Sequence, residues 1–197
     1  MFTGIIETLG EVIATRQEGG NLVITVQSAI TGELKVDQSV AHNGVCLTVT
    51  NISGNTYQTV AVAETLQKTN IGQLATGRKI NLERAMVFNG RIDGHLVQGH
   101  VDSTGVCLSR EEQDGSWLYR FSYPEEFAGL IVEKGSICMN GISLTVFNVT
   151  DSEFSVAIIP YTFEHTNVSE IHPDDEINLE FDILGKYVAR QLAAVKI

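Results

Sequence analysis

A thiol at Cys46 and a hydroxyl at Ser143, at equivalent positions of a repeated motif, are the first candidates for chemistry in this sequence. Cys46 lies in Asn43–Val49 (NGVCLTV), Ser143 lies in Asn140–Val146 (NGISLTV), and both motifs begin with an Asn-Gly pair. A thiol is the stronger nucleophile of the two, so the motifs predict similar pockets with different reactivity. An inert, buried thiol inside a strand is the alternative for Cys46. The pairing favours a protein that handles two copies of one small molecule unequally.

Two histidines, His95 and His100, lie in the glycine-rich segment Gly94–Asp102. Their separation is odd, which places them on opposite faces of a strand, and it is too long for one face of a helix. A shared metal ion is therefore not indicated, and no further ligand cluster is evident in the sequence. We interpret His100 as a proton acceptor near neutral pH, with a surface histidine as the alternative.

Other polar side chains recur at predicted strand ends, where they suit the edge of a flat, hydrogen-bonding heterocycle. They are Ser39, Thr48, Glu64, Thr65, Lys134, Ser143, Thr145, Thr162 and Asp182. Turn capping is the alternative for any single threonine. Glu83 and Glu180 recur inside strands and are expected to be structural. The sequence has no phosphate-binding glycine loop, dinucleotide fingerprint or Gly-x-Ser-x-Gly motif.

The elements that must position these residues occur twice. Glu64–Asn70 returns as Tyr161–Asn167, and Ile80–Glu83 returns as Ile177–Glu180, at the same offset of 97 residues that relates Cys46 to Ser143. A constant offset over separate segments indicates one structural unit used twice. We predict an N-terminal barrel in residues 1–92, a C-terminal barrel in residues 93–182, and a helix in residues 183–197.

Strand signals dominate both halves. Short β-branched runs separated by turn residues predict strands at residues 21–26, 46–51, 57–62, 117–123, 142–149 and 154–159. Many short strands at close spacing indicate an antiparallel sandwich or closed barrel in each half. Helical signals are limited to residues 64–70, 162–167, 124–130 and 183–195. In the last of these Leu184, Val188, Leu192 and Val195 share one face, which predicts burial against the barrel or another subunit.

Composition restricts the class of protein. The formal net charge of -11 disfavours nucleic acid and anionic membrane as partners. Three cysteines without metal-type spacing indicate free thiols, and no signal peptide or membrane-spanning run is recognised. We expect a soluble cytoplasmic protein.

Several motifs together resemble those of riboflavin synthases. They are Met1–Glu7 (MFTGIIE), the two Asn-Gly-x-[Cys/Ser]-Leu-Thr-Val motifs, Gly94–His100 (GHLVQGH) and Ile158–Thr162 (IIPYT), in the order and spacing of that family. The resemblance implies an all-β fold of two similar six-stranded Greek-key barrels and a C-terminal helix that assembles a homotrimer. It also implies an active site shared between subunits.

The implied activity is the dismutation of two molecules of 6,7-dimethyl-8-ribityllumazine, the last step of riboflavin biosynthesis. One molecule transfers a four-carbon unit to the other, which gives riboflavin and 5-amino-6-ribitylamino-2,4-pyrimidinedione. The family requires no metal, flavin or nicotinamide cofactor. Cys46 and His100 match its catalytic thiol and histidine, and Ser39 matches a nearby hydroxyl; Cys46 or Ser39 adds to the ring, or orients a water, and the sequence does not choose between them.

The resemblance also implies substrate-binding positions, carried over residue by residue. Those of the N-terminal barrel are Gly4, Ile5, Ile6, Cys46, Leu47, Thr48, Val60, Ala61, Val62, Ala63, Glu64, Thr65, Gly99, His100 and Val101. Those of the C-terminal barrel are Ser143, Leu144, Thr145, Ile158, Ile159, Pro160, Tyr161, Thr162 and Phe163, with Lys134 and Asp182 near the second ligand. Tyr161 departs from the family pattern, in which we expect a shorter polar side chain.

Two other functions have related sequences. Lumazine proteins are non-enzymatic antennae that bind a lumazine or flavin, but they alter the histidine-glycine motif and lack the trimerising helix, both of which this sequence has. A flavin-binding barrel of an oxidoreductase is a remoter alternative, because no nicotinamide domain follows.

Overall fold

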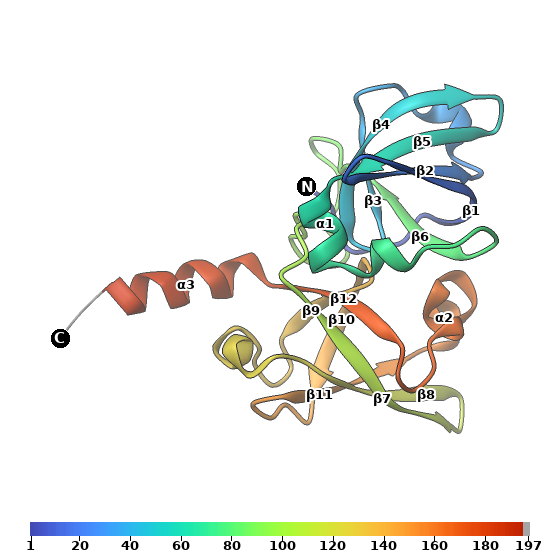
Figure 1. Cartoon of the computed structure of the whole chain (residues 1–197). Coiled ribbons are helices and arrows are strands. Elements are labelled where there is room, and N and C mark those ends of the chain that lie inside the picture. Colours follow the sequence, from blue (N-terminus) through green and yellow to red (C-terminus); the bar gives the residue numbers. More distant parts are fainter. Residues whose placement is uncertain (195–197) are drawn as a thin grey trace.

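Two closed antiparallel barrels make up most of the chain in a computed structural model that describes residues 1–194 (Figure 1). The strands of the N-terminal barrel are β1 (Thr8–Glu18), β2 (Asn21–Gln27), β3 (Ser39–His42), β4 (Val45–Ser53), β5 (Thr56–Ala61) and β6 (Lys79–Arg84). Those of the C-terminal barrel are β7 (Ser103–Gln113), β8 (Ser116–Ser122), β9 (Ser136–Met139), β10 (Ile142–Phe147), β11 (Glu153–Ile158) and β12 (Glu176–Phe181). The two barrels have the same strand order, so the predicted fold is confirmed.

Alternating burial along the strands separates an apolar interior from an outer face in each barrel. In β5 the side chains of Tyr57, Thr59 and Ala61 are buried, whereas Gln58 and Val60 are half-buried. The cores are separate, one built on residues such as Ile24, Leu82 and Tyr57 and the other on Phe121, Phe154 and Phe181. Each barrel therefore keeps one face free for other contacts.

Short helices connect the strands at matching places in the two barrels. They are α1 (Ala63–Lys68), α2 (Pro160–His165) and the 3-10 helices η1 (Thr31–Glu33), η2 (Asn70–Gln73), η3 (Glu125–Leu130) and η4 (Asn167–Glu170). The helix predicted after Pro124 is the 3-10 helix η3.

The C-terminal helix α3 (Ile183–Ala194) projects away from both barrels (Figure 1). Its apolar side chains Leu184, Tyr187, Val188 and Leu192 are 58–69% exposed. The predicted positions Val195 and Lys196 lie outside the described residues. The two barrels therefore leave most of this apolar face uncovered.

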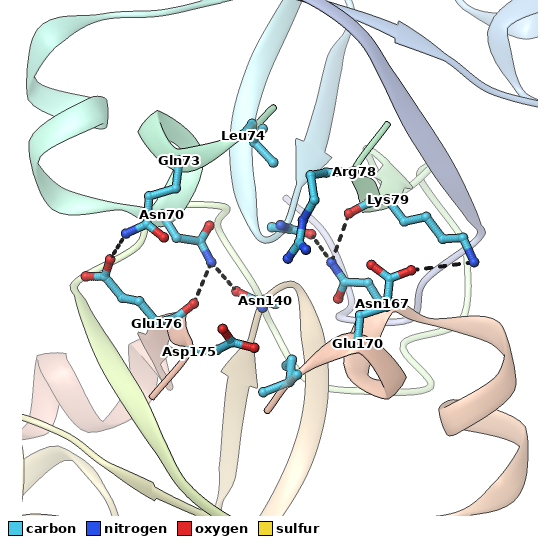
Figure 2. Close-up of a pocket in the computed structure, with 12 residues that line it drawn as sticks. Asn70, Gln73, Leu74, Arg78, Lys79, Asn140, Asn167, Glu170, Asp175 and Glu176 are labelled. Atoms are coloured by element: carbon cyan, nitrogen blue, oxygen red, sulfur yellow. Dashed lines mark hydrogen bonds and ion pairs between the residues drawn. The ribbon is translucent and has the colours of Figure 1, made fainter. Parts of the chain in front are cut away.

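A network of buried asparagines joins the two barrels (Figure 2). Asn167 N donates to Asn81 Oδ1 at 2.8 Å, and the residues 97 positions away make the matching bond, from Asn70 N to Asn178 Oδ1 at 2.7 Å. Asn70 also donates through Nδ2 to Asn140 Oδ1 at 3.1 Å. Because buried amides are costly when unpaired, these bonds fix how the two barrels face each other.

Candidate active site

Cys46 lies on the outer face of the N-terminal barrel, in a sheet region formed by β3, β4 and β5. Ser39 pairs in register with Thr48 and Ala41 pairs with Cys46, while the intervening Val40 and Leu47 point into the core. Strand alternation therefore gathers Ser39, Cys46 and Thr48 on one outward surface, which β5 extends with Val60. We call this surface the N half-site. Val62 and Thr65 continue it beyond the end of β5 and on α1.

The same face of the C-terminal barrel carries Ser143 and contains an open cavity of about 410 Å³. The lining residues are Lys134, Ser143, Leu144, Thr145, Phe147, Ala157, Ile159 and Thr162. We call this surface the C half-site. Its volume suits a small bicyclic ligand. Six of the eight lining residues were predicted from the sequence; Phe147 and Ala157 were missed, although alternation from Ser143 and Thr145 would have placed Phe147 on this face.

Two extended segments cross between the barrels and reach the half-sites. Phe2–Ile6 precedes the N-terminal barrel, Val97–Val101 precedes the C-terminal barrel, and Phe2 and Val97 pair with each other as an isolated antiparallel bridge. Cys46 N donates to Gly99 O at 2.9 Å, and Ser143 N donates to Gly4 O at 2.7 Å. Each crossing segment therefore binds the reactive strand of the other barrel.

Two buried carboxylates hold these crossing segments. Glu83 accepts hydrogen bonds from Thr3 N at 2.6 Å and Gly4 N at 2.9 Å. Glu180 accepts from Gln98 N at 2.6 Å, Gly99 N at 2.9 Å and His100 N at 2.8 Å. Burial raises the pKa of both carboxyl groups, and these N–H bonds partly oppose that effect. The geometry matches the structural role expected for the two glutamates.

Gly99 must be a glycine for the segment that carries His100 to pack against Cys46. Its φ is +78°, and a Cβ at this position would lie 2.6 Å from Cys46 Cβ. Because Gly99 approaches this closely, the backbone just before the exposed His100 lies against the strand that carries Cys46. The catalytic roles of Cys46 and His100 stay a prediction; the structure shows that the backbone just before His100 is hydrogen-bonded to the strand that carries Cys46.

Gly4 and Ile6 lie against a different barrel from the one expected. We expected them with the N-terminal barrel, but Gly4 is bonded to Ser143 and Ile6 packs against the C-terminal core. The reason is the crossing of the segments, which no local pattern encodes. Unlike Ile6, Ile5 does not pack in the C-terminal core; with Ser39 it lines a second cavity of about 500 Å³.

His95 is a functional candidate that the sequence analysis assigned no role. Its Nδ1 lies 2.7 Å from Ser143 Oγ, so the C half-site contains a histidine–hydroxyl pair. Burial lowers the pKa of His95, with an opposing effect from Asp182. Gly94 allows this approach, since a Cβ there would collide with Thr3 O. A strand-face argument could not find the contact because the two residues are 48 positions apart.

Several other predicted residues face the interior and can meet a ligand only through their backbone. Leu47, Ala61 and Ile158 are at most 5% exposed. Val101 packs against the N-terminal core, and Phe163 stacks on Trp117 with ring centroids 3.6 Å apart.

The remaining predicted residues lie at the rims. Ala63 and Glu64 are exposed on α1, where Glu64 forms an ion pair with Lys68. Pro160 begins α2, and Tyr161 is 68% exposed and stacks on His165. Asp182 caps the start of α3 by accepting from Leu184 N at 2.9 Å.

Among residues 1–194, no group of three or more His, Cys, Asp and Glu side chains is placed to hold a metal ion. No helix in that range is long and apolar enough to cross a membrane.

Comparison with known proteins identifies related sequences over nearly the whole chain. The family model described as "Lumazine binding domain" matches twice, at residues 3–85 and 98–182. The riboflavin synthase of Actinobacillus pleuropneumoniae is 40% identical over 193 residues, which cover 98% of this chain and 90% of the relative. That of Mycobacterium bovis is 40% identical over 195 residues, covering 96% and 97%.

Similar folds occur in solved structures. LumP complexed with riboflavin has a TM-score of 0.86 at 19% identity and covers 92% of this chain and 99% of its own. LumP complexed with 6,7-dimethyl-8-(1'-D-ribityl) lumazine has a TM-score of 0.83 at 19% identity, covering 91% and 98%. At this identity the likeness shows the fold alone.

Proposed function

This chain belongs to the riboflavin synthase family and is an enzyme with that family's activity, and we propose that its two half-sites each hold one 6,7-dimethyl-8-ribityllumazine. The reaction is a dismutation that transfers a four-carbon unit and yields riboflavin and 5-amino-6-ribitylamino-2,4-pyrimidinedione. The observation that carries the site proposal is the pair of equivalent outer faces that differ at Cys46 and Ser143.

Proton removal from one lumazine begins the proposed reaction. The 7-methyl group is conjugated to an electron-poor ring, so loss of a proton leaves a delocalised anion. His100 accepts this proton, while hydroxyl and backbone donors at the strand ends bind the ring carbonyls. Donors aimed at the developing charge contribute about 3 kcal/mol each.

The thiol of Cys46 acts on the second lumazine, the one that has not lost a proton. Either Cys46 or Ser39 adds to C7 of the bound ring, or orients a water that adds there. The adding group gives up its proton, the C7=N electron pair moves to the ring nitrogen, and the added group later leaves with its own electron pair. Holding two rings in register supplies roughly 7–11 kcal/mol of the barrier, which explains how the reaction proceeds on binding energy and proton transfer.

We propose that the two half-sites of one reaction come from different subunits of a homotrimer. Supporting this, the apolar side chains of α3 are largely exposed and lack a cover among the described residues. Burying such a stripe between symmetric copies is the usual way to stabilise it. A cytoplasmic location fits the three free cysteines Cys46, Cys107 and Cys138.

The test is turnover by the purified chain. We expect 6,7-dimethyl-8-ribityllumazine to be converted to riboflavin without added cofactor, followed as a change in absorbance and fluorescence. The protein that binds lumazine but never forms riboflavin would instead be an antenna of the lumazine-protein type.

A further inference from the structure

One shielded ion pair joins the first turns of α3 to the segment that carries His100. Lys186 Nζ lies 2.6 Å from Asp102 Oδ2, and each of the two side chains is only 21% exposed. The same carboxylate oxygen accepts a hydrogen bond from Phe181 N at 2.9 Å. Low exposure strengthens the attraction between the charges and raises the cost of leaving one of them alone.

Asp102 ends a strip of backbone that is fixed along β12. The N–H groups of residues 98–100 bind Glu180, and Asp102 N donates to Leu179 O at 2.9 Å. His100 is only two residues from Asp102 and lies in the same strip of backbone.

The other end of the strip is the thiol strand. Gly99 O accepts the hydrogen bond from Cys46 N, and Gly99 leaves no free space toward Cys46. Motion of the strip is therefore passed through Gly99 to the strand that carries Cys46. In a site that must align two rings, a misplacement of about 1 Å can cost about 100-fold in rate.

Helix α3 has few other ties to its own chain. Asp182 caps its start, Lys186 N donates to Asp182 O at 3.3 Å, and beyond these bonds the helix approaches η3 and then projects outward (Figure 1). Among the described residues, Lys186 makes the only ion pair between α3 and a barrel. The direction of the helix and the position of the strip are thus linked at one contact.

We propose that Lys186 is a positioning residue: it holds Asp102, and through Asp102 the strip from His100 to Cys46, so that the docked position of α3 sets the rate at the N half-site. The inference rests on the proposed function and gives α3 a role besides assembly. Helix placement by neighbouring copies then controls the chemistry of each subunit.

The test compares full-length variants at matched oligomeric state. We expect Lys186→Met to remain in the same oligomer as the parent by light scattering, while its kcat falls 10- to 100-fold and its KM for the lumazine changes less than threefold. Lys186→Arg keeps the charge and is expected to recover at least half of the parent rate. Arg190→Met removes the same charge from the next turn of α3 and is expected to leave kcat within twofold.

A double variant separates positioning from general damage. If Lys186 acts through Asp102, the variant Asp102→Asn with Lys186→Met is no slower than Lys186→Met alone, because residues that act as a unit are not additive. The proposal is overturned if Lys186→Met keeps the parent kcat, if Lys186→Arg is as slow as Lys186→Met, or if activity falls only in proportion to lost assembly.

Failure of the proposed function would be recognised separately. If the parent protein binds riboflavin but does not turn over the lumazine, the assigned reaction is wrong. The role of Lys186 is then tested by comparing the riboflavin affinity of the parent and of Lys186→Met in a fluorescence titration. Weakening of one of the two binding phases in Lys186→Met supports the inference, and two unchanged phases refute it.

Discussion

At the residue scale, the two copies of the repeat differ by a sulfur at Cys46 and an oxygen at Ser143 on equivalent backbones. Cys46 and Ser143 have equivalent strand positions, and each donates a backbone hydrogen bond to a glycine of a different crossing segment, Gly99 for Cys46 and Gly4 for Ser143. What differs is the side-chain atom, sulfur or oxygen, and the contact with a histidine: His95 Nδ1 lies 2.7 Å from Ser143 Oγ, whereas the exposed His100 follows the glycine that packs against Cys46. We therefore expect the two half-sites to be related in shape and unequal in reactivity.

Replacing the thiol tests this inequality. We expect Cys46→Ser to lower kcat about 10-fold, because the hydroxyl fits the same space but is a weaker nucleophile, and Cys46→Ala to lower it further. Steady-state kinetics on lumazine measure both effects. Equal rates for the parent and both variants would show Cys46 to be an inert thiol.

A second residue-scale feature is the buried histidine of the N-terminal core. His42 donates through Nδ1 to Val40 O and binds Tyr57 OH through Nε2 at 2.8 Å. Burial lowers the pKa of His42 to about 4. The folded protein thus binds a proton here less readily than the unfolded chain, whose histidine has a pKa of about 6.5.

We expect this histidine to make folding stability depend on pH. Its contribution is complete above about pH 6.5, and it is lost as the pH falls toward 4, by about 2 kcal/mol at pH 5 and about 3 kcal/mol in all. Urea unfolding at several pH values measures it. His42→Met, which copies Met139 of the other barrel, should remove this pH-dependent part, and an identical pH slope in both proteins would contradict the assignment.

At the element scale, the crossing segments connect each barrel to the reactive strand of the other. Their backbones are held by Glu83 and Glu180, which occupy equivalent positions in the two copies of the repeat. The strands supply the surfaces, but the segments bring in His100 and leave room for His95. The contacts between the crossing segments and the strands thus depend on glycines that allow close approach.

Gly99→Ala is the sharpest test of that close approach. The added Cβ would meet Cys46 Cβ and backbone while sitting at positive φ, so we expect kcat to fall about 100-fold and stability to drop by about 1–3 kcal/mol. Gly115→Ala is the control, because its φ is +85° and nothing lies within 4 Å of the added Cβ. The control should lose about 1 kcal/mol through backbone strain and keep its kcat, measured by kinetics and urea unfolding. Equal activity of Gly99→Ala and Gly115→Ala would mean that the approach is dispensable.

The sequence predicted the strand faces and missed the crossings for a physical reason. Alternation in β3 and β4 places Ser39, Cys46 and Thr48 on one surface, because neighbouring side chains in a strand point to opposite faces. The bond from Ser143 to Gly4 and the contact from Ser143 to His95 depend instead on how two finished barrels pack together. No period within a single segment contains that information.

At the scale of the whole molecule, two barrels fixed by buried asparagines present their half-sites while α3 extends outward. The asparagine bonds keep the halves in one orientation, so assembly through α3 can place half-sites of different copies reproducibly. The same helix contacts the strip at Asp102. Assembly and catalysis are therefore expected to respond together to its loss.

Ending the chain at Asp182 tests the role of this helix. We expect a folded monomer with the circular dichroism of the barrels, since both cores are complete without α3, and a loss of at least 100-fold in kcat. Light scattering and lumazine turnover measure the two effects. A monomer that turns over at the parent rate would refute the shared site.

The crossing of Phe2–Ile6 and Val97–Val101 also limits what half of this protein could do. A single barrel would keep the glutamate that binds its own N-terminal segment. That segment would have no second barrel to pack on, and the strand with the thiol or hydroxyl would not be covered by a segment of another barrel. Two such barrels on separate chains would be completed only if they exchanged their N-terminal segments, as in a domain-swapped dimer. Joining the two barrels in one chain keeps this exchange within the molecule. The residue at the position of Cys46 and Ser143 can then differ between the two barrels.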